Sequence, residues 1–169
     1  MKESETKARI IDINIRPMEE SDIEKAAALE EATFSMPWKA ADFLEMVKAT
    51  YAYYFVAEMT LVSGDDDSIV GICGLRNIAG EGEITNVAVD EKYRRCGIGR
   101  KLIERALDQC SQLDISDVTL EVRAGNEAAI GLYEKFGFKS EGIRPRFYEH
   151  PTEDAQIMWL RGLKKVMEW

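Results

Sequence analysis

Two glycines in a basic loop are the first residues whose spacing suggests a binding site. Gly97 and Gly99 close the run Arg94–Gly99 (RRCGIG), and Arg100 and Lys101 follow directly. A glycine loop that leads into a helix presents unpaired backbone N–H groups and the positive end of the helix dipole to an anion. Because glycine has no Cβ, a diphosphate can approach that backbone closely. The loop therefore predicts a phosphate-binding site, the alternative being a surface loop that only caps the helix.

The glycine spacing also separates this loop from the common nucleotide-binding motifs. It reads RxxGxG, whereas a dinucleotide-binding fold has GxGxxG and a P-loop ends in GK[ST]. The loop therefore fits neither nucleotide-binding motif well.

A carboxylate and a phenol further along the chain have the chemistry for proton transfer. In the run 117–123 (DVTLEVR), alternation predicts a strand that places Glu121 on the face opposite Val118. Partial burial would raise the pKa of Glu121 and suit it to take a proton from an ammonium, directly or through water. The alternative is a strand carboxylate paired with Arg123 or a lysine. Tyr133 could protonate a leaving group from its helix, and the alternative is core packing.

Hydrophobic periodicity predicts the elements that must position these residues. Strands are predicted at Ile11–Ile15, Tyr51–Leu61, Ile69–Asn77, Thr85–Asp90, Asp117–Arg123, Phe138–Ile143 and Ala155–Leu160. Helices are predicted after a cap at Ser21 or Asp22, over Lys39–Lys48, from the glycine loop to Cys110, and from a cap at Asn126 to a left-handed Gly137. A loop, RPRFYEHPTED, joins the last two strands.

This order of elements predicts an α/β fold. Its sheet would be mixed and mostly antiparallel, with about seven strands and about four flanking helices. The helix between the strands at Thr85–Asp90 and Asp117–Arg123 makes that one pair parallel. If these two strands splay, a ligand arm can lie between them and take backbone hydrogen bonds from Val87 and Val89.

Composition limits the number of domains and the kinds of partner. At 169 residues and 46% hydrophobic, the chain is long enough for one buried core and short for two. We expect one domain over residues 10–169 behind a mobile polar tail at 1–9. The net charge of −9 argues against nucleic acid as a partner and suits a cationic substrate.

Cysteine usage and hydropathy indicate the compartment. Cys73, Cys96 and Cys110 are odd in number and lack metal-ligand spacing, which favours reduced thiols in a cytoplasm. No apolar run has the length of a membrane span, and the N-terminus lacks the apolar core of a signal peptide. We therefore expect a cytoplasmic protein that does not contact a membrane.

Three other features have ordinary interpretations. Cys96 lies near a helix start, but nothing in the sequence places a base beside it, so covalent catalysis is not favoured. His150 is the only histidine and has no partners with metal-ligand spacing, so no metal site is predicted. The run Asp65–Asp67 is expected to be a solvated turn.

Several motifs together resemble one enzyme family. The VAV strand (87–89) with its RxxGxG loop is similar to the coenzyme A site of GNAT acetyltransferases. The run EVRAGNEAAIGLYEKFGF (121–138) resembles the signature of the RimI-type ribosomal-protein-alanine N-acetyltransferases and of related protein N-terminal acetyltransferases, as do Pro37-Trp38 and the late EDAQIMWL. The resemblance covers nearly all of residues 13–160 and implies a GNAT fold.

The resemblance implies roles for particular residues. Glu121 would be the general base and Tyr133 the general acid, with acetyl-CoA as co-substrate and no metal. The implied cofactor-binding residues are Val87, Ala88, Val89, Arg94, Arg95, Cys96, Gly97, Ile98, Gly99, Arg100 and Asn126. Two sequence departures bear on the site. Gly125 replaces the usual serine before Asn126, and Phe147 stands where many relatives have a tyrosine.

The acceptor is expected to be a peptide N-terminus. An α-amine has a pKa near 8 against about 10.4 for lysine, so a single carboxylate base deprotonates it more readily. Met36, Pro37 and Trp38 could face Phe147 and Tyr148 across a groove for a peptide. The resemblance implies the N-terminal alanine of the eighteenth small-subunit ribosomal protein, and a basic ribosomal partner would suit the negative charge. The alternatives are a GNAT enzyme for a small amine, polyamine or antibiotic, and a module that binds acyl-CoA without catalysis.

Overall fold

The computed structural model describes residues 10–61 and 68–163. The expected tail at 1–9 and the expected Asp65–Asp67 turn lie outside these residues. Within them, no helix is long and apolar enough to cross a membrane.

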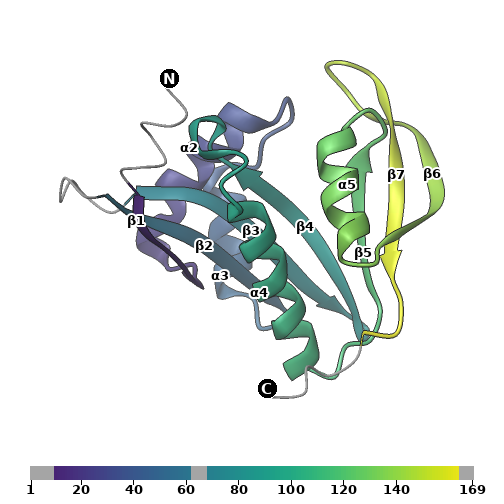
Figure 1. The fold of residues 1–169 in the computed structure, drawn as a ribbon, viewed down its shortest axis with the longest axis horizontal. Helices are drawn as coiled ribbons and strands as arrows, with labels where there is room; N and C mark the ends of the chain where they lie inside the picture. Colours follow the sequence, from purple (N-terminus) through teal and green to yellow (C-terminus); the bar gives the residue numbers. More distant parts are fainter. Residues whose placement is uncertain (1–9, 62–67, 164–169) are drawn as a thin grey trace.

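One twisted sheet of seven strands organises the chain, in the order β1-β2-β3-β4-β5-β7-β6 (Figure 1). The strands are β1 (Ile10–Pro17), β2 (Ala52–Leu61), β3 (Ser68–Ile78), β4 (Glu81–Val89), β5 (Val118–Arg123), β6 (Lys139–Tyr148) and β7 (Glu153–Leu160). Among the strands of the described residues, only β4 and β5 pair in parallel, because helix α4 (Ile98–Gln112) carries the chain back between them. The predicted mixed, mostly antiparallel sheet is therefore confirmed.

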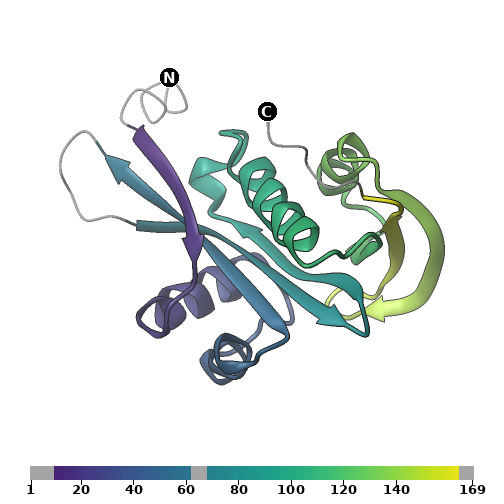
Figure 2. The ribbon, with the colours of Figure 1, turned by 90° about the horizontal axis from the view of Figure 1, so that it is seen from below.

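Helices cover both faces of the sheet (Figure 2). Helices α2 (Ile23–Thr33) and α3 (Ala40–Lys48) lie on one face, where Phe43, Met46 and Val56 are buried. Helices α4 and α5 (Glu127–Lys135) lie on the other, over the larger core cluster. Short 3-10 turns, η1 (Glu20–Asp22) and η2 (Glu91–Tyr93), precede α2 and α4.

The parallel ladder between β4 and β5 is short. It joins residues 82–84 of β4 to residues 118–120 of β5, although β4 continues to Val89 and β5 to Arg123. Beyond Ile84 and Leu120 the two strands diverge (Figure 1). The splay expected from the sequence is present, and its vertex lies at these two residues.

A β-bulge in β4 lies at this vertex. Strand β3 pairs Leu75 with Ile84 and Gly74 with Asn86, so Thr85 is the extra residue. The bulge changes which residues face each side: Ile84 belongs to the core under α4, whereas Ala88 belongs to the core under α2 and α3. Such bulges re-aim side chains beside functional sites.

Two predicted helix ends are confirmed. Asn126 Oδ1 accepts the backbone N–H of Ala129 at 3.2 Å and caps α5. Gly137 follows that helix with φ of +98°, the left-handed conformation that glycine adopts without strain.

Two other local predictions were wrong in part. Asp22 is the N-cap residue of α2, as one of the two expected positions, but its side chain makes no capping hydrogen bond, because its carboxylate is bound by Arg16 and by the N–H of Glu19. Strand β6 continues to Tyr148 through residues expected to form a loop, and β7 already begins at Glu153. Pro145 fits within β6 because this strand is at the sheet edge, where a missing N–H can be tolerated.

Candidate active site

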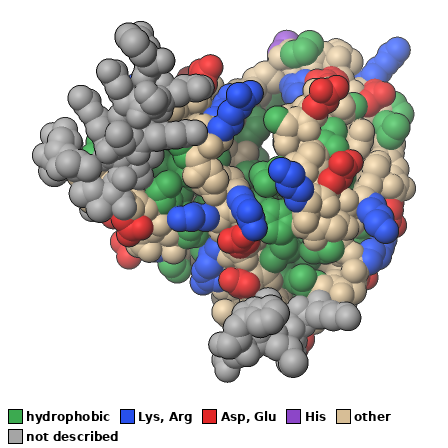
Figure 3. Space-filling view, viewed as in Figure 1, with side chains coloured by type: hydrophobic (Ala, Val, Ile, Leu, Met, Phe, Trp, Pro, Cys, Tyr) green, Lys and Arg blue, Asp and Glu red, His purple; other side chains and the backbone are tan. Residues whose placement is uncertain are grey.

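The glycine loop lies between the end of β4 and the start of α4. Gly97 is the N-cap residue of α4 with φ of +80°, and a Cβ there would meet no atom within 4 Å. Ile98 is buried and turns its side chain into the core near Gly71, so its backbone alone is available to a ligand. Figure 3 shows a hollow between this end of α4 and α5, with Lys and Arg side chains on its rim. The loop thus has the exposed backbone and positive rim that an anion requires.

The arginines of this loop differ in what they contact. Arg94 Nε donates to the carbonyl of Val89 at 3.3 Å, and Arg100 pairs with Glu104 at 3.0 Å along α4. Arg95 is exposed with φ of +63°. Cys96 is half-buried against the core, and its thiol is free, like those of Cys73 and Cys110.

Replacing Gly97 with alanine is expected to weaken acetyl-CoA binding by roughly tenfold. The added methyl group would enter the space that the predicted phosphate site needs, and the left-handed φ costs about 1–2 kcal/mol of stability. Gly80→Ala is the matched control, because Gly80 also has a positive φ (+88°) with nothing near its Cβ. Calorimetric titration and thermal melts should show both variants destabilised and only Gly97→Ala weakened in binding. Equal affinities would contradict the loop assignment.

The open edge of β4 beyond the vertex faces no strand among the described residues. Residues 87–89 pair with residues 71–73 of β3 on their other edge. Val87 and Val89 direct half-buried side chains at the larger core. Backbone groups on the open edge can therefore bind an extended ligand arm as a neighbouring strand would.

Glu121 lies at the vertex, directly after Leu120, the last residue of β5 that pairs with β4. It lies on the face opposite the buried Val118, as predicted. Burial is the largest influence and raises the pKa of Glu121 above its ordinary value, and Glu83 adds to this, while Arg144 opposes it. Arg144 Nε is 2.9 Å from Glu121 Oε1. The carboxylate does have a cationic partner, but that partner is Arg144 of β6 instead of Arg123 or a lysine.

Tyr133 lies on the other face of the sheet, in α5. Its residue is 7% exposed, and its ring packs edge-on against Phe138 with centroids 6.0 Å apart. Burial raises the pKa of Tyr133 far above its ordinary value, so its phenol keeps its proton at neutral pH. Tyr133 is therefore a core residue that can also donate a proton, so the core-packing and proton-donor interpretations of the sequence are compatible.

The two expected walls of the acceptor groove come together in the structure. Ser35, in the loop at 34–38, donates its hydroxyl to the carbonyl of Glu149 at 3.0 Å. Trp38 packs on Tyr54, with ring centroids 6.0 Å apart, while Met36 is half exposed. The pKa of Tyr148 is raised to about 12, chiefly because the phenol is buried. The nearby carboxylate of Glu121 also contributes to this shift. Phe147 is exposed beside it, and Pro37 is half-buried.

Arg123 joins these walls, and sequence reasoning missed this role. Its guanidinium donates to Ser35 Oγ (2.8 Å), to the carbonyls of Glu149 and Pro151 (2.9 Å each) and to Glu153 (3.2 Å). It also lies 4.5 Å from the centre of the Tyr148 ring. Because most of these partners are loop residues distant in sequence, no local pattern could have indicated them.

Replacing Arg123 with lysine should raise the KM for the acceptor roughly tenfold, equivalent to about 1.4 kcal/mol, while the acetyl-CoA dissociation constant stays unchanged. A lysine ammonium cannot reach four acceptors from one planar group, so both walls lose their common support. Arg161→Lys is the control, since Arg161 pairs with Glu141 and Asp117 elsewhere on the surface. Steady-state kinetics with a peptide acceptor would measure the change, and an unaltered KM would refute the linking role.

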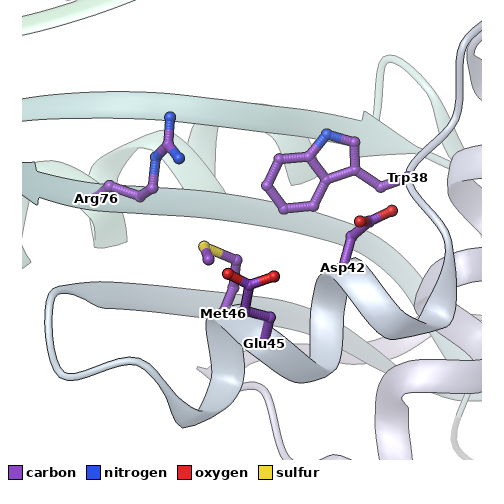
Figure 4. A pocket seen from close by; sticks show the side chains of 5 residues that line it. All are labelled: Trp38, Asp42, Glu45, Met46 and Arg76. Carbon is purple, nitrogen blue, oxygen red and sulfur yellow. The ribbon is translucent and has the colours of Figure 1, made fainter.

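A pocket of about 330 Å³ adjoins the Trp38 wall (Figure 4). Asp42 and Glu45 project into it from α3, and Arg76 of β3 lies beside Trp38. Arg76 is already paired with Glu83 at 2.9 Å. The two carboxylates of α3 could accept a cationic group.

The described part of the chain contains no set of side chains suited to bind a metal ion. No group of three or more His, Cys, Asp or Glu residues there could hold a metal ion. His150 is exposed in the turn between β6 and β7.

The split β4–β5 pair lies beside the glycine loop that caps α4, and known proteins with similar sequences and structures identify the family. Residues 23–138 match the model of the acetyltransferase (GNAT) family. A Bacillus subtilis protein provisionally named a [ribosomal protein bS18]-alanine N-acetyltransferase is 35% identical over 147 residues, which cover 86% of this chain and 93% of that protein.

Two further comparisons agree. The [ribosomal protein bS18]-alanine N-acetyltransferase of Escherichia coli K12 is 31% identical over 150 residues, covering 86% of this chain and 95% of that enzyme. The crystal structure of the E. coli ribosomal-protein-S18-alanine N-acetyltransferase has a TM-score of 0.79 at 30% identity, covering 93% of this chain and 97% of that one.

The chain therefore belongs to the GNAT acetyltransferase family. It is an acyl-CoA-dependent N-acetyltransferase, which confirms the family resemblance seen in the sequence. The family match ends at residue 138, so β6, β7 and the residues Phe147 and Tyr148 lie outside it.

Proposed function

We propose that this enzyme acetylates a protein N-terminal α-amine, with the N-terminal alanine of ribosomal protein bS18 as its leading substrate. The observation that carries the proposal is the vertex of the β4–β5 gap, where Glu121 lies beside the joined acceptor walls. The names of the bacterial relatives support the choice of bS18. A basic ribosomal protein also suits a chain of net charge −9.

The cofactor site follows from the gap and the glycine loop. The backbone at 97–99 would hold the diphosphate, and Arg94, Arg95 and Arg100 would add positive charge. The open edge of Val87–Val89 would bind the pantetheine arm, which places the acyl end toward the vertex. Asn126 would contact the cofactor in addition to capping α5. When bound, acetyl-CoA supplies the acetyl group as a thioester.

Two residues on opposite faces of the sheet would carry out the proton transfers of the reaction. Glu121 accepts a proton from the acceptor ammonium, directly or through water, and the neutral amine then forms the N–C bond as the C–S bond breaks. Tyr133 donates its phenolic proton to the departing sulfur, and it regains a proton, through water, as the acetylated nitrogen loses its second one. Because Glu121 and Tyr133 lie on different faces of the sheet, the base can approach the amine from one side while the acid approaches the sulfur from the other.

The acceptor would enter on the face of α2 and α3. Met36, Pro37 and Trp38 form one side of its groove, and Phe147 and Tyr148 form the other. An α-amine with pKa near 8 is already partly neutral at physiological pH, which matches a single carboxylate base. In the cytoplasm, where we place this enzyme, ribosomal proteins are available as acceptors.

The alternative acceptor is a small cationic amine, and the pocket carrying Asp42 and Glu45 is the observation that favours it. We would supply acetyl-CoA with the N-terminal peptide of bS18, peptides with other N-termini, a polyamine and an aminoglycoside, and measure free thiol release. Acetylation of the bS18 peptide at its α-amine, at the highest kcat/KM of the panel, is expected. Faster transfer to the small amines would overturn the proposal, and acetyl-CoA binding without turnover would indicate a binding module.

A further inference from the structure

A buried carboxyl group lies behind the gap, among residues given no role so far. Glu30, in the last turn of α2, is 2% exposed. Its Oε1 accepts hydrogen bonds from the side-chain amide of Asn86 at 3.0 Å and from the backbone N–H of Trp38 at 3.4 Å. Its Oε2 is buried and has no hydrogen-bond partner within residues 10–61 and 68–163. One oxygen therefore connects three segments of the chain, and the other accepts no hydrogen bond from the described residues.

The partner Asn86 belongs to a buried network at the β4 bulge. Tyr54 donates its hydroxyl to Asn86 Oδ1 at 3.3 Å and lies 2.7 Å from Thr85 Oγ1. The Tyr54 ring packs over Gly74, where any Cβ would come within 2.5 Å of it. Thr85 is the bulged residue next to the last β4–β5 pair. The network thus leads from Glu30 to the vertex of the gap.

The other partner, Trp38, belongs to the acceptor wall. Its backbone N–H is bound by Glu30, and its ring packs against Phe43 and Tyr54 at centroid distances of 5.6 and 6.0 Å. Glu30 is therefore the polar group shared by the acceptor wall and the strand that would bind the acyl end of acetyl-CoA.

Stability alone does not account for a carboxyl group at this place. Glu30 follows Ile23 and Ala26 on the buried side of α2, where apolar side chains pack well. Burial raises the pKa of Glu30 to about 7, because the charged form loses its hydration, although the Trp38 and Asn86 hydrogen bonds oppose this. Oε1 can accept both hydrogen bonds in either protonation state, with any proton on Oε2.

We propose that Glu30 is a positioning residue for acetyl transfer, which holds the Trp38 backbone at a fixed distance from the β4 bulge. The proposal rests on the proposed function, since the distance it sets is that between the acceptor amine and the thioester. Misplacement of reacting groups by about 1 Å is enough to slow a reaction roughly a hundredfold.

The first test compares three variants in α2. Glu30→Leu removes the acceptor oxygen, and we expect kcat/KM for the bS18 peptide to fall at least tenfold while the acetyl-CoA dissociation constant stays within about twofold. Glu30→Gln keeps an oxygen at the Oε1 position and should remain within about threefold of wild type. Glu31→Gln is the control, because Glu31 is exposed on the same helix. A folded Glu30→Leu enzyme with wild-type kcat/KM would overturn the proposal.

The second test remains decisive if Glu30→Leu fails to fold. Asn86→Asp sets a second carboxylate against Glu30, and kcat/KM for the peptide should fall at least tenfold. Adding Glu30→Gln to that variant restores a donor and acceptor pair, and activity should return to within about threefold of Glu30→Gln alone. A double variant no better than Asn86→Asp would contradict the proposal. Turnover of the wild-type enzyme with the bS18 peptide is measured first, because its absence would refute the proposed function itself. If the wild-type enzyme is active and the variants have the same kcat/KM, only the role of Glu30 is refuted.

Discussion

Replacing Glu121 with glutamine is expected to lower kcat for a peptide acceptor by roughly 10²- to 10³-fold, the usual contribution of a general base. The amide keeps the size of the side chain but cannot accept the ammonium proton. Acetyl-CoA affinity should change little, because the proposed cofactor contacts lie along β4 and the glycine loop. Steady-state kinetics and a direct binding titration measure the two quantities separately.

The loss of kcat in Glu121→Gln should become smaller as the pH rises. A carboxylate base works only when ionised, and burial raises the pKa of Glu121, so the acid limb of the wild-type profile should lie above the ordinary carboxyl range. Above pH 8 the α-amine is largely neutral, and the variant should come closest to wild type there. Glu141→Gln is the matched control, since Glu141 is also a strand carboxylate paired with an arginine, Arg161. An acid limb retained by Glu121→Gln would remove Glu121 from the role of base.

Replacing Tyr133 with phenylalanine should lower kcat by roughly 10- to 100-fold, because the departing sulfur loses its proton donor. The raised pKa of Tyr133 keeps the phenol protonated, so wild-type activity should show no alkaline loss from this residue below pH 10. The ring contact with Phe138 remains in the variant, and the melting temperature should stay close to that of wild type.

Tyr53→Phe is the control for Tyr133, since it removes a hydroxyl from a partly buried tyrosine that packs on the same core. Rapid-mixing measurement of thiol release isolates the transfer step from product release. A Tyr133→Phe enzyme with undiminished transfer would leave Tyr133 with a packing role only.

The elements of the fold could be predicted because each depends on a local pattern. Alternation in β5 places Val118, Leu120 and Val122 in the core, as the sequence indicated. The cap at Asn126 and the left-handed Gly137 follow from the local chemistry of those residues. The order of elements and the handedness of crossovers then fix the parallel pair.

The site could be predicted only in part, because its contacts join residues far apart in the chain. The Glu121–Arg144 pair depends on β6, much of which was expected to form a loop. The bulge at Thr85 depends on the register between β3 and β4, which no single strand determines. The sequence does mark Glu30 as unusual, since it is an acidic residue on the apolar side of a helix. Its partner Asn86 lies on another element, so the sequence does not indicate their hydrogen bond.

The crystal structure of the enzyme with acetyl-CoA tests the central claim most directly. We predict the pantetheine arm between Thr85–Val89 and β5, the diphosphate on the backbone of Gly97–Gly99, and the thioester beside Glu121. A complex in which β4 and β5 pair along their full length, with the diphosphate bound away from Gly97–Gly99, would contradict the account.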